Sequence, residues 1–115
     1  MTDTEATARD LARRIIAVPG WAADLGGTVA AVRDLLAATA DDPDIARQVG
    51  DRAAAILQEV ATEPMALIER YPDLLPHERR VAMLGGALEA LRDGRDAAGE
   101  MMRIANGAPG PVVEP

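Results

Sequence analysis

Apolar residues recur along this chain at intervals of three and four, which is the period of one side of an α-helix. The alternation at every second position that indicates a half-buried strand is not found. The 24 alanines among 115 residues add an intrinsic helical preference. We therefore predict an all-α fold, a compact bundle of four to six helices.

A first helix is predicted over about residues 3–18, where Thr2 and Glu5 have the spacing of a capping box. Pro19-Gly20 ends this helix. Trp21 follows in a loop, and a single tryptophan between helices is expected to pack over the end of the hydrophobic core and close it.

A second helix is predicted from about residue 25 to 39, and the third helix has the clearest start. Asp42 suits its N-cap, Pro43 its first position, and Asp44 complements the helix dipole. Pro64 ends it and begins a short helix that reaches about Arg70, after which two further prolines prevent a regular helix.

The last predicted helix begins at Pro76 and extends to Ala105, with Asn106-Gly107 as a left-handed C-cap. Gly94 lies inside it at a cost of about 1 kcal/mol relative to alanine and is a candidate break. We predict one helical domain over residues 1–107 and a short extended, Pro-rich C-terminal tail over 108–115.

This last helix is apolar on two sides. One side has the heptad spacing of a coiled coil and includes Val81, Leu84, Leu88 and Leu91. The other is small and apolar, so that backbones can approach closely. A helix that is apolar on two sides is either the central helix of the bundle or meets another protein on its small side, and a short bundle has few helices to cover both sides. We therefore predict an interface with another protein on the small side, at Ala82, Met83, Gly86, Ala87 and Ala90.

The amino-acid composition excludes most of the common classes of catalytic residue. The chain has no cysteine, serine, lysine or phenylalanine, which excludes thiol and serine nucleophiles, Schiff-base lysines and the lysine of a phosphate-binding loop. We expect a protein that is not an enzyme and has no catalytic residues, cofactor or bound metal.

Net charge is −7, and such a surface repels nucleic acid and anionic lipid. The acidic, polar N-terminus contains no signal-peptide-like stretch, and no apolar run reaches the length of a membrane span. We expect a cytoplasmic protein with no membrane or nucleic-acid partner.

Three motifs resemble ligand sites and each has a simpler interpretation. His77-Glu78 begins like a zinc-protease motif, but Val81 stands where the second imidazole is needed, so His77 is interpreted as a solvated or capping residue. The aspartates at 41–44 lack the glycine and glutamate of a calcium loop and are interpreted as a helix cap. Gly26-Gly27 before a helix is interpreted as a tight turn rather than an anion site.

Carboxylates near the C-terminal end of the chain are a further candidate. Asp93, Asp96 and Glu100 fit acid–base chemistry only inside a cleft, and a solvated helix face is the simpler interpretation.

The leading hypothesis is a non-catalytic protein–protein interaction module that acts as a homo-oligomer, adaptor or accessory subunit. One alternative is a DNA-binding regulator, because residues 44–60 resemble a helix-turn-helix unit, although an uninterrupted helix explains the same residues. A further alternative is a helical domain that binds an apolar ligand in a pocket lined by Met65, Met83, Met101 and Met102.

Overall fold

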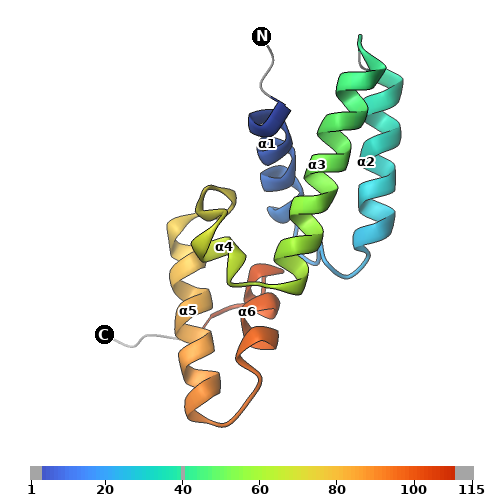
Figure 1. Cartoon of the computed structure of the whole chain (residues 1–115). Coiled ribbons are helices and arrows are strands. Elements are labelled where there is room, and N and C mark those ends of the chain that lie inside the picture. The colour runs from blue at the N-terminus through green and yellow to red at the C-terminus, as the bar shows by residue number, and fades with distance from the viewer. Residues whose placement is uncertain (1–3, 40, 111–115) are drawn as a thin grey trace.

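The fold is all-α, as predicted, in a computed structural model that describes residues 4–39 and 41–110. These residues form six α-helices and one short 3₁₀ helix (Figure 1). In chain order the elements are α1 (Thr4–Ile16), α2 (Leu25–Thr39), α3 (Pro43–Thr62), α4 (Ala66–Glu69), η1 (Pro72–Leu74), α5 (His77–Arg92) and α6 (Ala97–Ala105). Thr2 and most of the predicted tail, residues 111–115, lie outside the described residues, and the predicted domain limits stay a prediction.

Helix α3 is the central element of the N-terminal half, because α1 and α2 both pack against it (Figure 1). The contact with α1 uses small side chains that bring the backbones close: Ala8 and Ala53 are buried together with Val49. Helix α2 contributes no fully buried residue, so it covers α3 from the outside.

The start of α3 confirms the predicted cap. The Asp42 carboxylate accepts hydrogen bonds from the backbone N–H groups of Asp44, at 3.0 Å, and Ile45, at 3.4 Å, and Pro43 occupies the first turn. The helix then continues without a break, and Gly50 lies inside it rather than in a turn. Residues 44–60 are therefore part of one helix and do not form a helix-turn-helix unit.

The main hydrophobic core lies where the two halves of the chain meet. Ile56 and Leu57 of α3 are fully buried there with Leu67, Leu74, Met83 and Ile104. Trp21 closes this core as expected, and its indole N–H donates a hydrogen bond to the Ala105 carbonyl at 3.1 Å.

The predicted helix over 76–105 is interrupted. Gly94 has φ = +71°, its N–H bonds to the Leu91 carbonyl at 3.2 Å, and the Arg95 N–H bonds to the Ala90 carbonyl at 2.7 Å. This pair of bonds is a Schellman motif, which ends α5 and needs glycine at the left-handed position. The chain reverses there, so α5 and α6 pack side by side as a hairpin (Figure 1).

The predicted end of the helical region is confirmed. Gly107 has φ = +106°, and the N–H groups of Gly107 and Ala108 bond to the Ile104 and Arg103 carbonyls. This is a second Schellman motif. The Arg79 guanidinium donates to the Ala108 carbonyl at 2.9 Å, which ties the segment after α6 back to α5.

The molecule is elongated, with dimensions of 51 × 27 × 21 Å. Figure 1 shows α1, α2 and α3 at one end and the α5–α6 hairpin at the other. Helix α5 lies at the outer edge of this hairpin, which leaves one of its sides without a neighbouring helix in the figure.

Candidate interaction surface

The outer side of α5 carries a row of exposed aliphatic side chains. Val81, Leu84, Leu88 and Leu91 are 52%, 38%, 64% and 65% exposed, respectively. Their spacing of three, four and three residues places them along one side of the helix. We call these four residues the α5 apolar stripe.

The small side of α5 faces the other way and packs against α6. Met83, Gly86 and Ala90 are buried, and Ala82 and Ala87 are half-buried. An added Cβ on Gly86 would overlap the Cδ1 atom of Ile104. The side that the sequence analysis assigned to an interface (Ala82, Met83, Gly86, Ala87 and Ala90) is thus covered within the chain, and the exposed apolar side is the opposite one.

The heptad spacing was visible in the sequence, but the choice of side was not. The small residues predict close approach by another protein, and in the structure the close approach is that of α6. A turn at Asp93-Gly94 was the signal that could have shown this, because a helical hairpin places small residues on its inner side.

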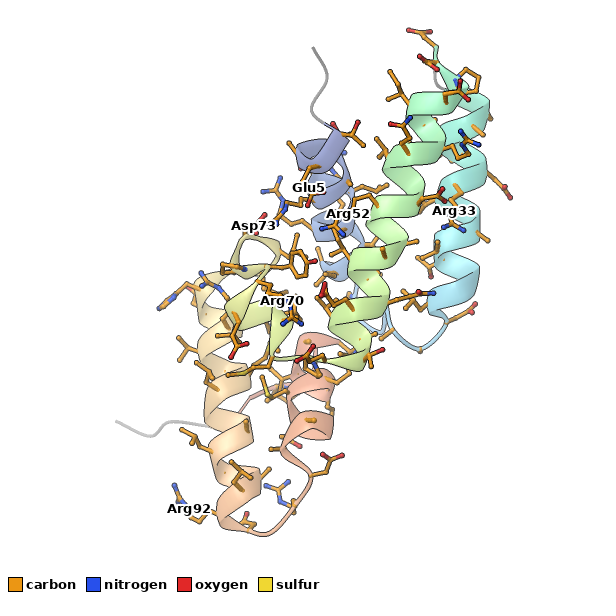
Figure 2. All side chains as sticks on the ribbon, viewed as in Figure 1. Glu5, Arg33, Arg52, Arg70, Asp73 and Arg92 are labelled. Atoms are coloured by element: carbon orange, nitrogen blue, oxygen red, sulfur yellow. The ribbon has the colours of Figure 1, made fainter. Side chains whose placement is uncertain are left out.

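Charged residues lie at the two ends of the α5 apolar stripe. Glu78 is exposed in the first turn of α5 and Arg92 is its exposed last residue. Neither forms an ion pair with another described residue. Figure 2 shows the Arg92 side chain at the far tip of the hairpin.

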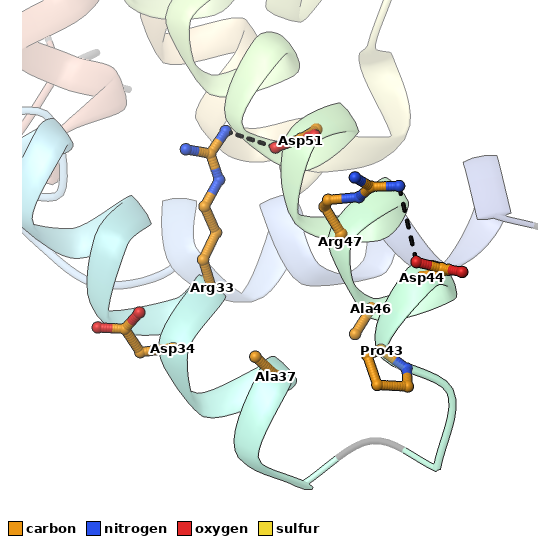
Figure 3. Close-up of a pocket in the computed structure, with 8 residues that line it drawn as sticks. All are labelled: Arg33, Asp34, Ala37, Pro43, Asp44, Ala46, Arg47 and Asp51. Carbon is orange, nitrogen blue, oxygen red and sulfur yellow. Dashed lines mark ion pairs between the residues drawn. The ribbon is translucent and has the colours of Figure 1, made fainter.

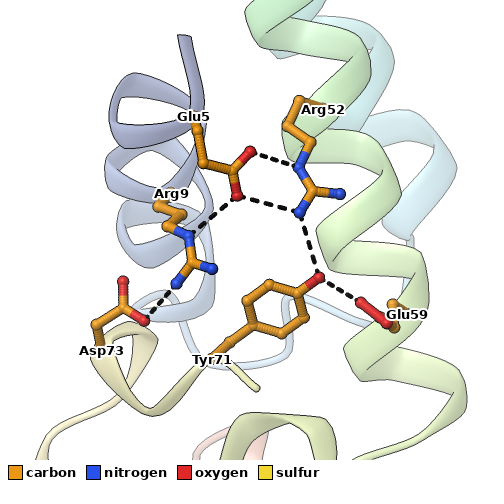
Figure 4. A network of polar contacts seen from close by, with 6 residues as sticks. All are labelled: Glu5, Arg9, Arg52, Glu59, Tyr71 and Asp73. Carbon is orange, nitrogen blue, oxygen red and sulfur yellow. Dashed lines mark hydrogen bonds and ion pairs between the residues drawn. The ribbon is translucent and has the colours of Figure 1, made fainter. Parts of the chain in front are cut away.

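A polar network joins α1, α3 and the segment before α5 (Figure 4). Arg52 binds Glu5 through both carboxylate oxygens, at 2.7 and 3.0 Å, and Arg9 links Glu5 to Asp73. The Arg52 hydrogen bonds, aided by Arg9, lower the pKa of Glu5 from 4.5 to about 2. The Glu5–Arg52 contact joins α1 to α3 and the Arg9–Asp73 contact joins α1 to η1, so the network has a structural role.

Tyr71 extends this network toward α3. Its hydroxyl donates to the Glu59 carboxylate at 2.5 Å and accepts a hydrogen bond from Arg52 at 3.4 Å. The bond to Glu59, together with burial, raises the pKa of the Tyr71 hydroxyl. Arg9 also lies over the Tyr71 ring, 5.0 Å from its centre.

A groove of about 380 Å³ lies between α2 and α3 (Figure 3). Four of its five charged groups form ion pairs: Arg33 pairs with Asp51 at 2.9 Å and Arg47 with Asp44 at 3.7 Å. Asp34, Ala37, Ala46 and Pro43 complete the lining. Because both arginines already have acidic partners, the groove has no free cation to bind an anionic ligand.

The other candidate motifs are found in the simpler roles. His77 is exposed at the first position of α5. The Asp24 carboxylate accepts a hydrogen bond from the Gly27 N–H at 3.2 Å and thus occupies the helix start where an anion would bind. Among the described residues no cluster of three or more histidine, aspartate or glutamate side chains is close enough to hold a metal.

Of the candidate carboxylates Asp93, Asp96 and Glu100, the first and the last pair with arginines. Glu100 pairs with Arg103 and with Arg95, and the Arg103 hydrogen bond lowers the pKa of Glu100. Arg95 also pairs with Asp93 at 3.4 Å.

The four methionines proposed to line a ligand pocket do not converge on one site. Met83 and Met101 are buried in the core, Met102 packs against it, and Met65 is exposed. The buried pair fills core volume, which is the usual role of methionine at helical spacing.

No described helix combines the length and apolar character needed to cross a membrane. Comparisons of the chain with protein-family models, with curated proteins and with solved structures found no match.

Proposed function

We propose that this chain is a non-catalytic protein–protein interaction module and that the α5 apolar stripe is its contact surface. The observation that supports this is the gathering of exposed aliphatic residues on α5. Of eight exposed large hydrophobic residues in the described part of the chain, four form this one row. Isolated exposed apolar residues are ordinary on protein surfaces, whereas a contiguous row at helical spacing marks a contact.

Energetics indicate what kind of partner is needed. Burying a leucine or valine side chain fully contributes about 1.5–3 kcal/mol, so covering four side chains that are each about half exposed contributes on the order of 4 kcal/mol. Association itself costs about 4–15 kcal/mol. The partner must therefore bring comparable apolar surface of its own, as a second amphipathic helix does.

Affinity purification from cells that encode the protein tests the proposal with a matched pair of variants. Leu88→Arg places a charge in the stripe, and Leu35→Arg makes the same change on α2 at a residue with the same 64% exposure. We expect the wild type and Leu35→Arg to retain a common protein, either another chain or an untagged copy of itself, that Leu88→Arg loses. Identical sets of retained proteins for all three would contradict the proposal. The cytoplasmic location expected from the sequence stays a prediction.

A further inference from the structure

We propose that the α5 apolar stripe binds the same stripe of a second copy of this chain, with the two helices antiparallel. This inference rests on the proposed function and names the partner. Val81, Leu84, Leu88 and Leu91 alternate between the a and d positions of a heptad, which form the seam of a two-stranded coiled coil. With 16 residues, α5 is about 24 Å long, so the seam is short.

The four positions match one another under a two-fold axis. In an antiparallel pair, Val81 of each copy lies opposite Leu91 of the other, and Leu84 lies opposite Leu88. Every layer of the seam then joins two large aliphatic side chains. A self-complementary stripe of this kind supplies the apolar surface that the partner must bring.

The charges beside the stripe distinguish antiparallel from parallel pairing. Glu78 and Arg92 are 14 residues, or two heptads, apart and therefore lie on the same edge of the stripe at its opposite ends. Antiparallel pairing brings Glu78 of each copy to Arg92 of the other, twice per dimer. Parallel pairing places this edge of each helix beside the other edge of its partner, so Glu78 and Arg92 do not meet.

The symmetric placement of these charges also favours a second copy of this chain, rather than a different protein, as the partner. Glu78 and Arg92 are equidistant from Gly85, which lies midway along the same edge. An ion pair that is repeated by a two-fold axis joins opposite charges at equal distances from that axis, whereas an unrelated helix imposes no such relation on this chain. Neither residue has an ion-pair partner among the described residues, so both are available to the second copy.

Charge reversal in the full-length purified protein tests the pairing. Sedimentation equilibrium at low salt is expected to give a wild-type dissociation constant on the order of 10 µM, as for a small interface. Glu78→Arg and Arg92→Glu each bring like charges together at both ends, and each is expected to weaken the dimer about three- to tenfold. The double variant restores opposite charges and is expected to return to within about twofold of the wild type. Asp34→Arg, the same charge change at an exposed residue of α2, is the control and is expected to have no effect.

Disulfide formation gives a second measurement that does not depend on the strength of surface ion pairs. The chain has no cysteine, so introduced thiols are the only ones present. The double variant Glu78→Cys, Arg92→Cys is expected to form a covalent dimer on mild oxidation, and Glu78→Cys alone is not.

Three results would overturn the inference: a wild type that stays monomeric at several hundred micromolar, a double charge reversal that fails to restore the dimer, or efficient cross-linking by Glu78→Cys alone. A wild type that stays monomeric would leave the proposed function intact if affinity purification identifies a different protein whose retention depends on Leu88. Loss of both self-association and any Leu88-dependent protein would remove the proposed function as well.

Discussion

Gly86 on α5 and Ile104 on α6 lie so close that a methyl group on the glycine would overlap the Cδ1 atom of the isoleucine. Ile104 is fully buried in the main core, so it has little room to move aside. This contact holds the small side of α5 against α6 and, as a consequence, turns the large aliphatic side outward.

Gly86→Ala is expected to lower the free energy of unfolding by about 1–3 kcal/mol, the usual cost of overpacking a core. Urea denaturation followed by circular dichroism measures the change. Gly26→Ala on α2 is the control, because no atom lies within 4 Å of the added methyl group and alanine favours the helix by up to about 1 kcal/mol. A Gly86→Ala variant as stable as the wild type would show that the helices are not in close contact.

Gly94→Ala is expected to destabilise the protein for a different reason, since nothing lies within 4 Å of the added methyl group. The cost is that of the left-handed backbone at φ = +71° and is about 1 kcal/mol. Asparagine adopts this conformation more readily, so Gly94→Asn should lose less stability than Gly94→Ala in the same thermal or urea experiment. Equal losses for the two variants would argue against a backbone cause.

Acid is expected to destabilise the protein partly through Glu5. Its pKa is lowered from 4.5 to about 2 in the folded state, first by the Arg52 hydrogen bonds, so the stabilisation is fully present above about pH 4.5 and is lost as the pH falls toward 2. Because the two side chains are 42% and 39% exposed, solvent screening limits the effect to about 1 kcal/mol or less.

Urea denaturation between pH 5 and pH 2 measures this contribution. Glu5→Gln should flatten the decline in stability, whereas Glu89→Gln, at an exposed glutamate outside the network, should keep the wild-type slope. An unchanged slope in Glu5→Gln would contradict the role given to the ion pair.

The single tyrosine allows a direct titration of the polar network. The hydrogen bond to Glu59 raises the pKa of the Tyr71 hydroxyl above 10.0. Ultraviolet difference absorbance of the folded protein should therefore show deprotonation at higher pH than in urea. Stability that depends on this bond is present below pH 10 and is lost as the pH rises through the folded-state pKa.

Glu59→Gln provides the control for that titration. Removing the carboxylate should lower the midpoint, since Arg52 remains and favours the phenolate. A midpoint that does not move on this substitution would contradict the contact between Tyr71 and Glu59.

Local signals predicted most of the fold. Asp42-Pro43 marked the start of α3, and Asn106-Gly107 marked the end of α6, because caps and left-handed glycines depend on a few adjacent residues. The same kind of signal at Gly94 predicts only a candidate break within one helix, whereas in the structure it ends α5.

Contacts between distant residues could not be predicted. The ion pair of Glu5 and Arg52 spans 47 residues, and no spacing rule within one helix indicates it. The covered side of α5 likewise depends on the position of Ile104 after the chain reverses. Both are tertiary contacts, which follow from how the helices are arranged in space.

Photo-cross-linking from position 88 tests most directly whether the α5 apolar stripe is a protein contact. A photoreactive amino acid replaces Leu88 in one variant and the equally exposed Leu35 in another, each in the full chain within cells that encode it. We expect a discrete cross-linked protein species from position 88, of twice the chain mass if the partner is a second copy, and none from position 35. If neither position gives a discrete cross-linked species, the claim that the α5 apolar stripe is a protein contact is contradicted.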